Sequence, residues 1–284
     1  MRKAQNILVL GGKGKTGRRV ASRLLAKGQS VRIGSRSETP SFDWEDPITW
    51  AGALEGMHSV YITFQPDLAV PGAREAIKGF TSQAVKSGIK KAVLLSGKGE
   101  IEAEKCEEIV KNSGLDWTIV RASWFNQNFS ESFFLDPILA GHVALPKNEA
   151  KVPYVDANDI ADVVVEALLN KEHNGNTYEL TGPRTLTFSD VVKEISVVTK
   201  KDIQFTSISM EEYNAMMKEF NLPDSYLWLI NYLFEEVLVE SNSVITNDIE
   251  KVLGRKPIDF TEYAQRTAAD GVWNLIPKTV AQKV

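Results

Sequence analysis

The chain has 284 residues and a formal net charge of −4, so it can form one large domain or a domain with a smaller appendage, and it has no broad basic face for nucleic acid. Its single cysteine, Cys106, excludes an intrachain disulfide and a thiolate metal cluster, and its three histidines are too far apart in sequence to predict a metal site. No signal peptide precedes the first expected strand and no apolar run is long enough to cross a bilayer, so we expect a cytoplasmic protein that does not bind membranes.

The first expected element is a buried strand at Asn6–Leu10, which leads into a glycine-rich segment and then into a helical pattern at Arg18–Leu25. In this context small residues let the backbone approach a pyrophosphate, and the helix N-terminus offers N–H groups to it. A tight turn that binds no ligand is the alternative, and the spacing does not match the phosphate loop of nucleotide triphosphatases. We predict a dinucleotide-binding turn formed by Gly11, Gly12, Lys13, Gly14, Lys15, Thr16 and Gly17.

The residues after the second expected strand, Ser30–Gly34, indicate which dinucleotide is bound. An NAD site has a carboxylate here that accepts from the ribose 2′-hydroxyl, whereas this chain has Ser35 and Arg36. A guanidinium fits a 2′-phosphate and a carboxylate repels it, so we predict NADP(H) as the cofactor. The two lysines of the glycine turn add positive charge near the phosphates, and nearby Glu38 would partly offset the preference. The alternative for Arg36 is an exposed loop charge.

Strands and helices alternate through residues 1–170, with further strands expected at Ser41–Trp44 and Ser59–Phe64 and a capped helix start at Thr187–Asp190. Continuous apolar, β-branched runs are typical of buried parallel strands. Their alternation with helices predicts an α/β fold with a doubly wound parallel sheet and right-handed crossovers. The remaining expected elements are strands at Lys91–Ser96, Asp116–Arg121 and Leu180–Leu186, and helices at Pro47–Leu54, Pro71–Ser87, Ile101–Ser113 and Asn158–Leu169.

The character of the chain changes beyond Phe205, where helices at Met210–Phe220 and Ser225–Val239 are rich in large apolar side chains. These side chains either form a core or dimer contacts, or line a substrate pocket. We expect a dinucleotide-binding domain at 1–170 and a smaller, mainly helical substrate-binding region at 171–284, from which the chain can return to the first domain. The large side chains in question are Met216, Met217, Trp228, Tyr232 and Phe234.

Several separated segments share the pattern of one family, and they cover most of residues 4–200: Gly11–Arg19, Phe42–Asp46, Thr49–Trp50, Ala53–Gly56, Ser113–Arg121 and Val155–Ala161. Together they resemble the NmrA-like family of atypical short-chain dehydrogenases/reductases. The Asp-Trp and Gln-Pro-Asp elements are most similar to its ergot-alkaloid group, the agroclavine/festuclavine-type dehydrogenases. The resemblance implies a Rossmann fold, an NADP(H) site and a small C-terminal substrate region. Members include reductases of quinones, imines and azo compounds, and dinucleotide-sensing regulators that catalyse nothing.

The resemblance also implies roles for residues outside the glycine turn. The carboxylate of Asp43 would accept from the adenine amino group, and Trp44 would pack nearby. The segment after the next strand would pass along the ribose and nicotinamide, and a serine would lie at the same carboxyl edge of the sheet. Ordinary turn chemistry is the alternative for each loop. These implied cofactor-binding positions are Asp43, Trp44, Thr63, Phe64, Gln65, Pro66 and Ser96.

The catalytic pair of this superfamily, a tyrosine followed after three residues by a lysine, is missing, because Gly99 and Ala103 stand at those positions. Alcohol–ketone interconversion needs such a proton donor, whereas an iminium ion accepts hydride without protonation. Cys106 is a poor nucleophile, since no histidine is near it in sequence and its neighbours are acidic. The acidic run itself indicates a solvated helix face. No residue is therefore assigned as catalytic.

Two hypotheses of function follow. The first is an NADPH-dependent oxidoreductase that transfers hydride to an electrophilic small molecule, such as a quinone, an imine or iminium ion, or an azo compound, of aromatic or polycyclic structure. The second is a non-catalytic NADP(H)-sensing regulator, which the missing pair favours. A sugar-nucleotide epimerase or dehydratase is disfavoured because it needs the same pair. A homodimer is compatible with either hypothesis.

Overall fold

The computed structural model describes residues 4–220 and 222–274 of the chain, which divides into two compact units. The chain enters the first unit three times, whereas the sequence analysis placed one boundary after residue 170 and allowed for a return. The first unit comprises Met1–Ala122, Ala157–Leu180 and Thr246–Lys256. The second comprises Ser123–Asp156, Thr181–Ile245 and Pro257–Val284.

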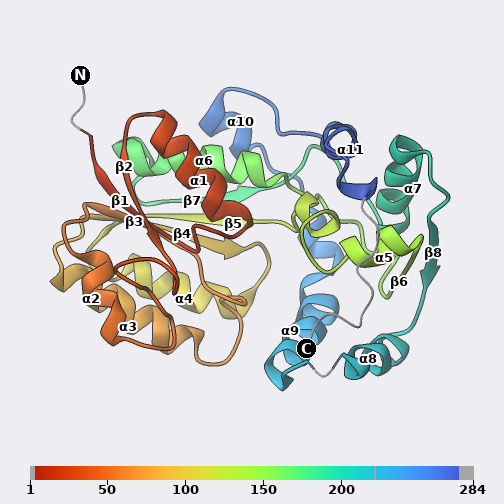
Figure 1. Ribbon diagram of the computed structural model, residues 1–284, viewed down its shortest axis with the longest axis horizontal. Coiled ribbons are helices and arrows are strands. Elements are labelled where there is room, and N and C mark those ends of the chain that lie inside the picture. Colours follow the sequence, from red (N-terminus) through yellow and green to blue (C-terminus); the bar gives the residue numbers. More distant parts are fainter. Residues whose placement is uncertain (1–3, 221, 275–284) are drawn as a thin grey trace. The chain divides into compact units, whose positions relative to one another are not determined.

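The first unit contains a parallel sheet with helices on both faces, which confirms the doubly wound fold. Its six strands have the order β2-β1-β3-β4-β5-β7, with α1 and α6 on one face and α2, α3 and α4 on the other (Figure 1). The central strands are mostly apolar because both of their faces are covered. The bounds are β1 Asn6–Leu10, α1 Lys15–Ala26, β2 Ser30–Gly34, α2 Ile48–Leu54, β3 Ser59–Ile62, α3 Ala73–Lys86, β4 Lys91–Gly97, α4 Ile101–Lys111, β5 Asp116–Ala122, α6 Ala157–Leu169, β7 Asn176–Leu180 and α10 Asp248–Leu253.

The strand order reverses between β1 and β3, which lie side by side although β2 separates them in sequence. Ligands of open α/β sheets bind outside the carboxyl ends of the strands at such a point. The expected strand at Ser41–Trp44 is wrong, because these residues form a loop. Phe42 and Trp44 instead pack their rings against Phe80 of α3, with centroids 5.6 and 5.2 Å away, so side-chain burial replaces strand pairing.

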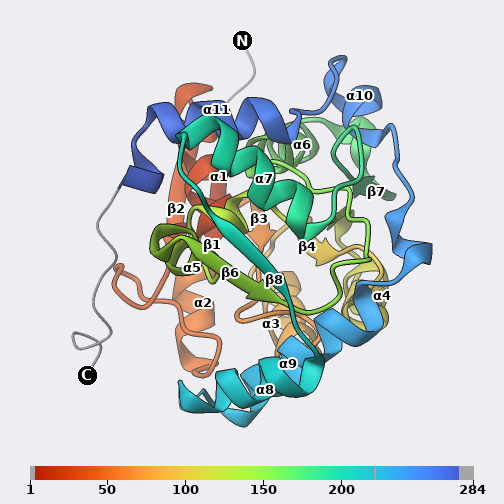
Figure 2. The same ribbon diagram turned by 90° about the vertical axis from the view of Figure 1, so that its right-hand side faces the viewer.

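The second unit is mainly helical and has its own core. A two-stranded parallel sheet, β6–β8, packs among helices whose buried side chains include Phe129, Phe188 and Phe260 (Figure 2). Thr187 forms the expected capping box with Asp190 at the start of α7. The bounds are α5 Leu135–Ala140, β6 His142–Leu145, α7 Phe188–Thr199, β8 Gln204–Ser207, α8 Met210–Glu219, α9 Asp224–Tyr232 and α11 Phe260–Ala269.

In the second half of the chain, one expected strand differs from the structure. The strand was expected at Leu180–Leu186, but strand β7 ends at Leu180. Leu186 forms only an isolated bridge with Val152. Among the large apolar side chains, Phe234 joins the core of the second unit, whereas Trp228 stacks on Tyr232 and stays 40% exposed. No helix within the described ranges is both long enough and apolar enough to span a membrane.

Candidate functional site

The glycine turn after β1 is shaped by contacts within its own backbone. Gly11 has φ +61°, a region that side chains disfavour, and its carbonyl accepts from the N–H of Gly14 at 2.8 Å. A Cβ on Gly17 would lie 2.2 Å from the carbonyl oxygen of Gly11, so α1 can approach the turn only with glycine there. Gly11 and Gly17 are therefore required by the fold, whether or not a ligand binds.

Gly14 differs from these two glycines because the surrounding protein atoms leave more room for a side chain at this position. A Cβ there would lie 3.2 Å from the Gly11 carbonyl oxygen and 3.8 Å from Nε2 of Gln65. Gly14 is the N-cap of α1, and no side chain caps this helix. The uncapped first turn is open to an anion, with which its N–H groups and helix dipole interact favourably. Gly14 is thus the glycine that a close-lying pyrophosphate explains best.

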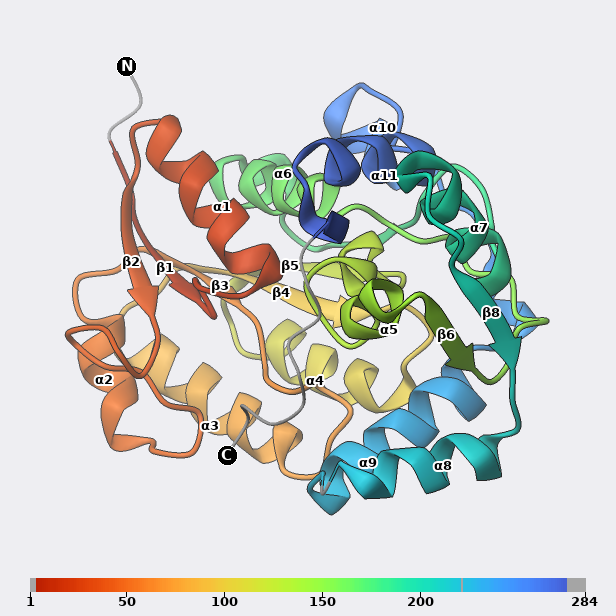
Figure 3. The ribbon, with the colours of Figure 1, turned by 45° about the vertical axis from the view of Figure 1, so that its right-hand side comes forward.

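β2 lies beside β1 (Figure 3), and the side chain of Lys13, in the turn after β1, contacts the loop after β2. Its Nζ donates to Oγ of Ser37 at 2.6 Å and pairs with Oε1 of Glu38 at 2.9 Å. The hydroxyl oxygens of Ser35 and Ser37 are 3.2 Å apart. Arg36 is exposed and has no polar partner among the described residues. The structure therefore brings Lys13 to the residues predicted to select the cofactor, an arrangement that sequence spacing did not reveal.

The loop after β3 lies beside the glycine turn. Oγ1 of Thr63 donates to the carbonyl of Leu10, the last residue of β1, at 3.1 Å, and a Cβ on Gly11 would lie 2.4 Å from that Oγ1. Thr16, at the start of α1, accepts from the hydroxyl of Tyr61 at 3.0 Å. Burial raises the pKa of Tyr61 far above its usual value, so this phenol stays a hydrogen-bond donor.

Trp44, in the segment between β2 and α2, contacts the loop after β3. Its Nε1 donates to the carbonyl of Thr63 at 3.1 Å, and its ring packs on Phe64 at a centroid distance of 4.9 Å. The carboxylate of Asp43 accepts from the backbone N–H of Glu45 at 3.1 Å. The segments implied by the family resemblance therefore meet at the carboxyl ends of β1 and β3, although their contact with a cofactor stays a prediction.

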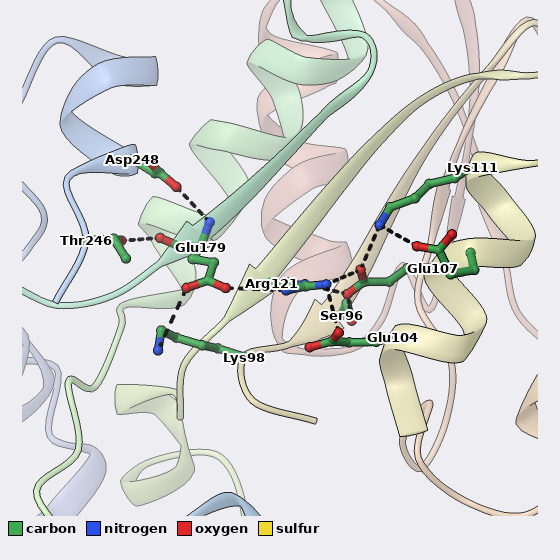
Figure 4. Close-up of polar contacts among 10 residues, drawn as sticks. Ser96, Lys98, Glu104, Glu107, Lys111, Arg121, Glu179, Thr246 and Asp248 are labelled. Carbon is green, nitrogen blue, oxygen red and sulfur yellow. Dashed lines mark hydrogen bonds and ion pairs between the residues drawn. The ribbon is translucent and has the colours of Figure 1, made fainter. Parts of the chain in front are cut away.

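Ser96 faces a buried charge cluster, which the sequence analysis missed. Its Oγ donates to Oε1 of Glu107 at 2.7 Å, and Arg121 donates to both carboxylate oxygens of Glu107 from Nε at 2.8 Å and Nη2 at 2.7 Å (Figure 4). The expectation that the acidic run is a solvated face is wrong for Glu107, whose side chain is 0% exposed. The signal that could have found it is the helical spacing of Ala103, Cys106, Glu107 and Val110, which together form the buried face of α4.

Metal-ligand groups and the single thiol complete the description of the titratable residues. No group of three or more histidine, cysteine, aspartate or glutamate side chains in the described ranges could hold a metal ion. Cys106 is buried, and burial together with nearby carboxylates raises the pKa of its thiol to about 12. A thiol of this pKa is not a nucleophile at neutral pH.

The fold and the glycine turn define a dinucleotide-binding protein, and the model of the NAD(P)H-binding family matches residues 11–171. The model of the NmrA-like family matches residues 94–264, more than half of the chain. The chain therefore belongs to the NmrA-like family, as its segments predicted. It is an NAD(P)-binding protein of an oxidoreductase family with a Rossmann-like fold.

Three characterised or named relatives align over nearly the whole chain. Prestalk A differentiation protein A of Dictyostelium discoideum is 29% identical over 92% of this chain and 92% of that protein. NAD(P)H azoreductase of Xenophilus azovorans is 27% identical over 93% of this chain and 98% of the relative. Agroclavine dehydrogenase of Claviceps fusiformis is 26% identical over 90% and 95%. The match to agroclavine dehydrogenase agrees with the predicted similarity to the ergot-alkaloid group, and the two named oxidoreductases do not favour the regulator hypothesis.

Among solved structures, the triphenylmethane reductase of Citrobacter sp. in complex with NADP(H) has a TM-score of 0.71 to this chain. It is 17% identical, and the alignment covers 93% of this chain and 99% of the reductase. At this identity the likeness supports the fold.

Proposed function

We propose that the protein is an NADPH-dependent reductase that transfers hydride to an electrophilic small molecule of aromatic or polycyclic structure. The substrate classes are quinones, imines or iminium ions, and azo compounds. The observation that carries the proposal is a group of cations and hydrogen-bond donors beside the uncapped start of α1. Lys13 of the glycine turn contributes to this group, together with Ser35, Arg36 and Ser37 of the loop after β2. The azoreductase and clavine dehydrogenase among the relatives support hydride transfer to such substrates.

The residues after β2 fit the 2′-phosphate of NADP(H). Two hydroxyls, one ammonium group and one guanidinium can all donate to phosphate oxygens. The carboxylate in this loop belongs to Glu38, and its charge is offset by the ion pair with Lys13. NADPH, when bound, supplies a hydride at its nicotinamide ring.

The chain's own residues bind and orient the cofactor and exclude water. The turn at Gly14 would take the pyrophosphate, Asp43 and Trp44 the adenine side, and the loop Thr63–Pro66 the ribose and nicotinamide side. With glycine at the position of the catalytic tyrosine, the favoured substrates are those that need no phenol as proton donor. An iminium ion is one, and a quinone is another if backbone N–H groups stabilise its developing oxyanion.

The cofactor part of the proposal is tested by the dissociation constants of NADPH and NADH for the wild type, Lys13→Ala and Arg36→Ala. We expect each substitution to weaken NADPH binding roughly tenfold, the scale of one charge-assisted contact at an exposed site, and to leave NADH binding unchanged. Lys86→Ala is the matched control, since Lys86 is an exposed lysine at the end of α3. Equal wild-type affinities for the two cofactors would refute the NADP(H) assignment.

The catalytic part is tested by NADPH consumption with a panel of quinones, azo dyes and cyclic iminium ions. Turnover of at least one class is expected, and the class with the highest kcat/KM identifies the substrate chemistry. Tight cofactor binding without turnover of any compound in the panel would contradict the proposal of a reductase and would instead support a cofactor-sensing protein.

A further inference from the structure

Two carboxyl groups meet at the carboxyl edge of the sheet in the first unit. Asp67 lies in the loop after β3, and Glu100 is the residue immediately before α4. Their side chains form a hydrogen bond with each other. Because an ionised carboxylate can only accept hydrogen bonds, this contact requires a proton on one of the two groups.

The surroundings favour Glu100 as the group that carries this proton. Its side chain is buried, and its Oε2 has no hydrogen-bond donor among the described residues that would stabilise a negative charge. Burial and the neighbouring charges of Asp67 and Glu107 raise the pKa of Glu100 well above its usual value. Burial also raises the pKa of Asp67, but the bond from Glu100 and the N–H of Ala69, which donates to Oδ1 at 2.8 Å, oppose this and favour the anion.

The negative charge of the pair is reduced by a bound proton rather than by a neighbouring cation. No lysine or arginine in the described part of the chain forms an ion pair with either carboxyl group. The other charged group that acts on Glu100 is Glu107 on α4. Cys106 on the same helix is close to Asp67 and also to the charges of Arg74, Glu75 and Glu102. The carboxyl of Glu100 also packs on the backbone of β4, since a Cβ on Gly97 would lie 1.8 Å from its Oε1.

The pair fastens the far end of the loop that borders the glycine turn. The near end is held by Thr63, whose Oγ1 donates to the carbonyl of Leu10 at 3.1 Å. Between the two ends, Nε2 of Gln65 lies 3.8 Å from the position that a Cβ of Gly14 would occupy. Asp67 is two residues from Gln65, so a displacement of Asp67 acts close to the part of the turn expected to hold the pyrophosphate.

We propose that Glu100 is a positioning residue for the cofactor site: its protonated side chain holds the loop Thr63–Asp67 against the glycine turn, and its ionisation at alkaline pH releases the loop and weakens NADPH binding. The inference rests on the proposed function. With the proton lost, the carboxylates of Asp67 and of the buried Glu100 repel each other across the former hydrogen bond. Glu100 thus acts through Asp67 rather than on the cofactor itself.

The test is the dissociation constant of NADPH between about pH 7 and pH 10, a range in which the 2′-phosphate is already ionised. For the wild type we expect the affinity to fall about tenfold toward the alkaline end, the scale of one hydrogen bond to a charged group. Glu100→Gln should keep its affinity throughout, because its amide N–H donates to Asp67 at every pH. Glu100→Ala should bind weakly at every pH, and Glu108→Gln, an exposed neighbour on α4, should behave as the wild type.

A second variant and a competing group sharpen the test. Gly97→Ala, which displaces the carboxyl of Glu100, should reproduce Glu100→Ala without removing any charge. Burial lowers the pKa of Lys91 to about 8, so Lys91 titrates in the same range, but it is intact in Glu100→Gln. An alkaline decline that persists in Glu100→Gln overturns the inference, as does a wild-type affinity that does not vary with pH. Absence of NADPH binding at neutral pH would instead overturn the proposed function, and this inference with it.

Discussion

Replacing Glu107 with glutamine tests whether the buried charge cluster beneath the candidate site stabilises the first unit. The side chain of Glu107 is 0% exposed and accepts from Ser96 and, through two bonds, from Arg121. Glutamine has nearly the same shape, but its amide group removes the ion pair and places a donor against the donors of Arg121. The substitution therefore removes the charge with little change in packing.

The expected loss of unfolding free energy is about 3 kcal/mol. Removing one partner of a buried ion pair costs about 3–5 kcal/mol, because the other charge is left buried and unpaired. Here Arg121 keeps Glu104 at 3.4 Å and Glu179 at 3.4 Å, so its charge retains partners and the lower end of the range applies (Figure 4). In the variant these two carboxylates still offset part of the free-energy cost of burying the Arg121 guanidinium.

The measurement is urea unfolding of the wild type, Glu107→Gln and Glu108→Gln. Glu108 is the adjacent residue of α4, its side chain is 64% exposed, and it pairs with Lys111 at 2.9 Å. An exposed pair of this kind contributes about 0–1 kcal/mol, so the control should change little. Similar losses for the two variants would show that the cluster around Glu107 adds no more stability than a surface ion pair, and would refute the reasoning.

Two further predictions concern glycine and pH. Gly17→Ala should strongly destabilise the protein, because the new Cβ would lie 2.2 Å from the backbone of Gly11, whereas Gly14→Ala should fold and lose NADPH affinity. Thermal unfolding measures the first effect and titration calorimetry the second. Equal losses of stability in the two variants would contradict the prediction. Because the pKa of Glu100 is raised, the folded protein keeps a proton that the unfolded chain releases above about pH 4.3, so stability should fall as the pH rises from there toward the raised pKa. Glu100→Gln should remove this decline, which melting temperatures at acidic, neutral and alkaline pH would measure; parallel curves for variant and wild type would count against it.

Local sequence patterns were sufficient for most of the first unit. Buried parallel strands are continuous apolar runs, and a glycine turn between strand and helix has a distinctive spacing, so β1, α1 and the glycine turn between them could be predicted from adjacent residues. The strand expected at Ser41–Trp44 failed because its aromatic residues pack on Phe80 of α3, which is distant in sequence. Propensity alone does not register such a contact.

The sequence by itself determined the fold class, the family and the position of the glycine turn, because each is read from short segments in which the informative residues are close together in the chain. Tertiary structure alone decided that Lys13 reaches Ser37 and that Asp67 meets Glu100. These pairs are 24 and 33 residues apart (37 − 13 and 100 − 67), and each is brought together by the parallel order of the strands. The physical reason is that charge, protonation and hydrogen bonding depend on distance in space, which the order of residues does not specify.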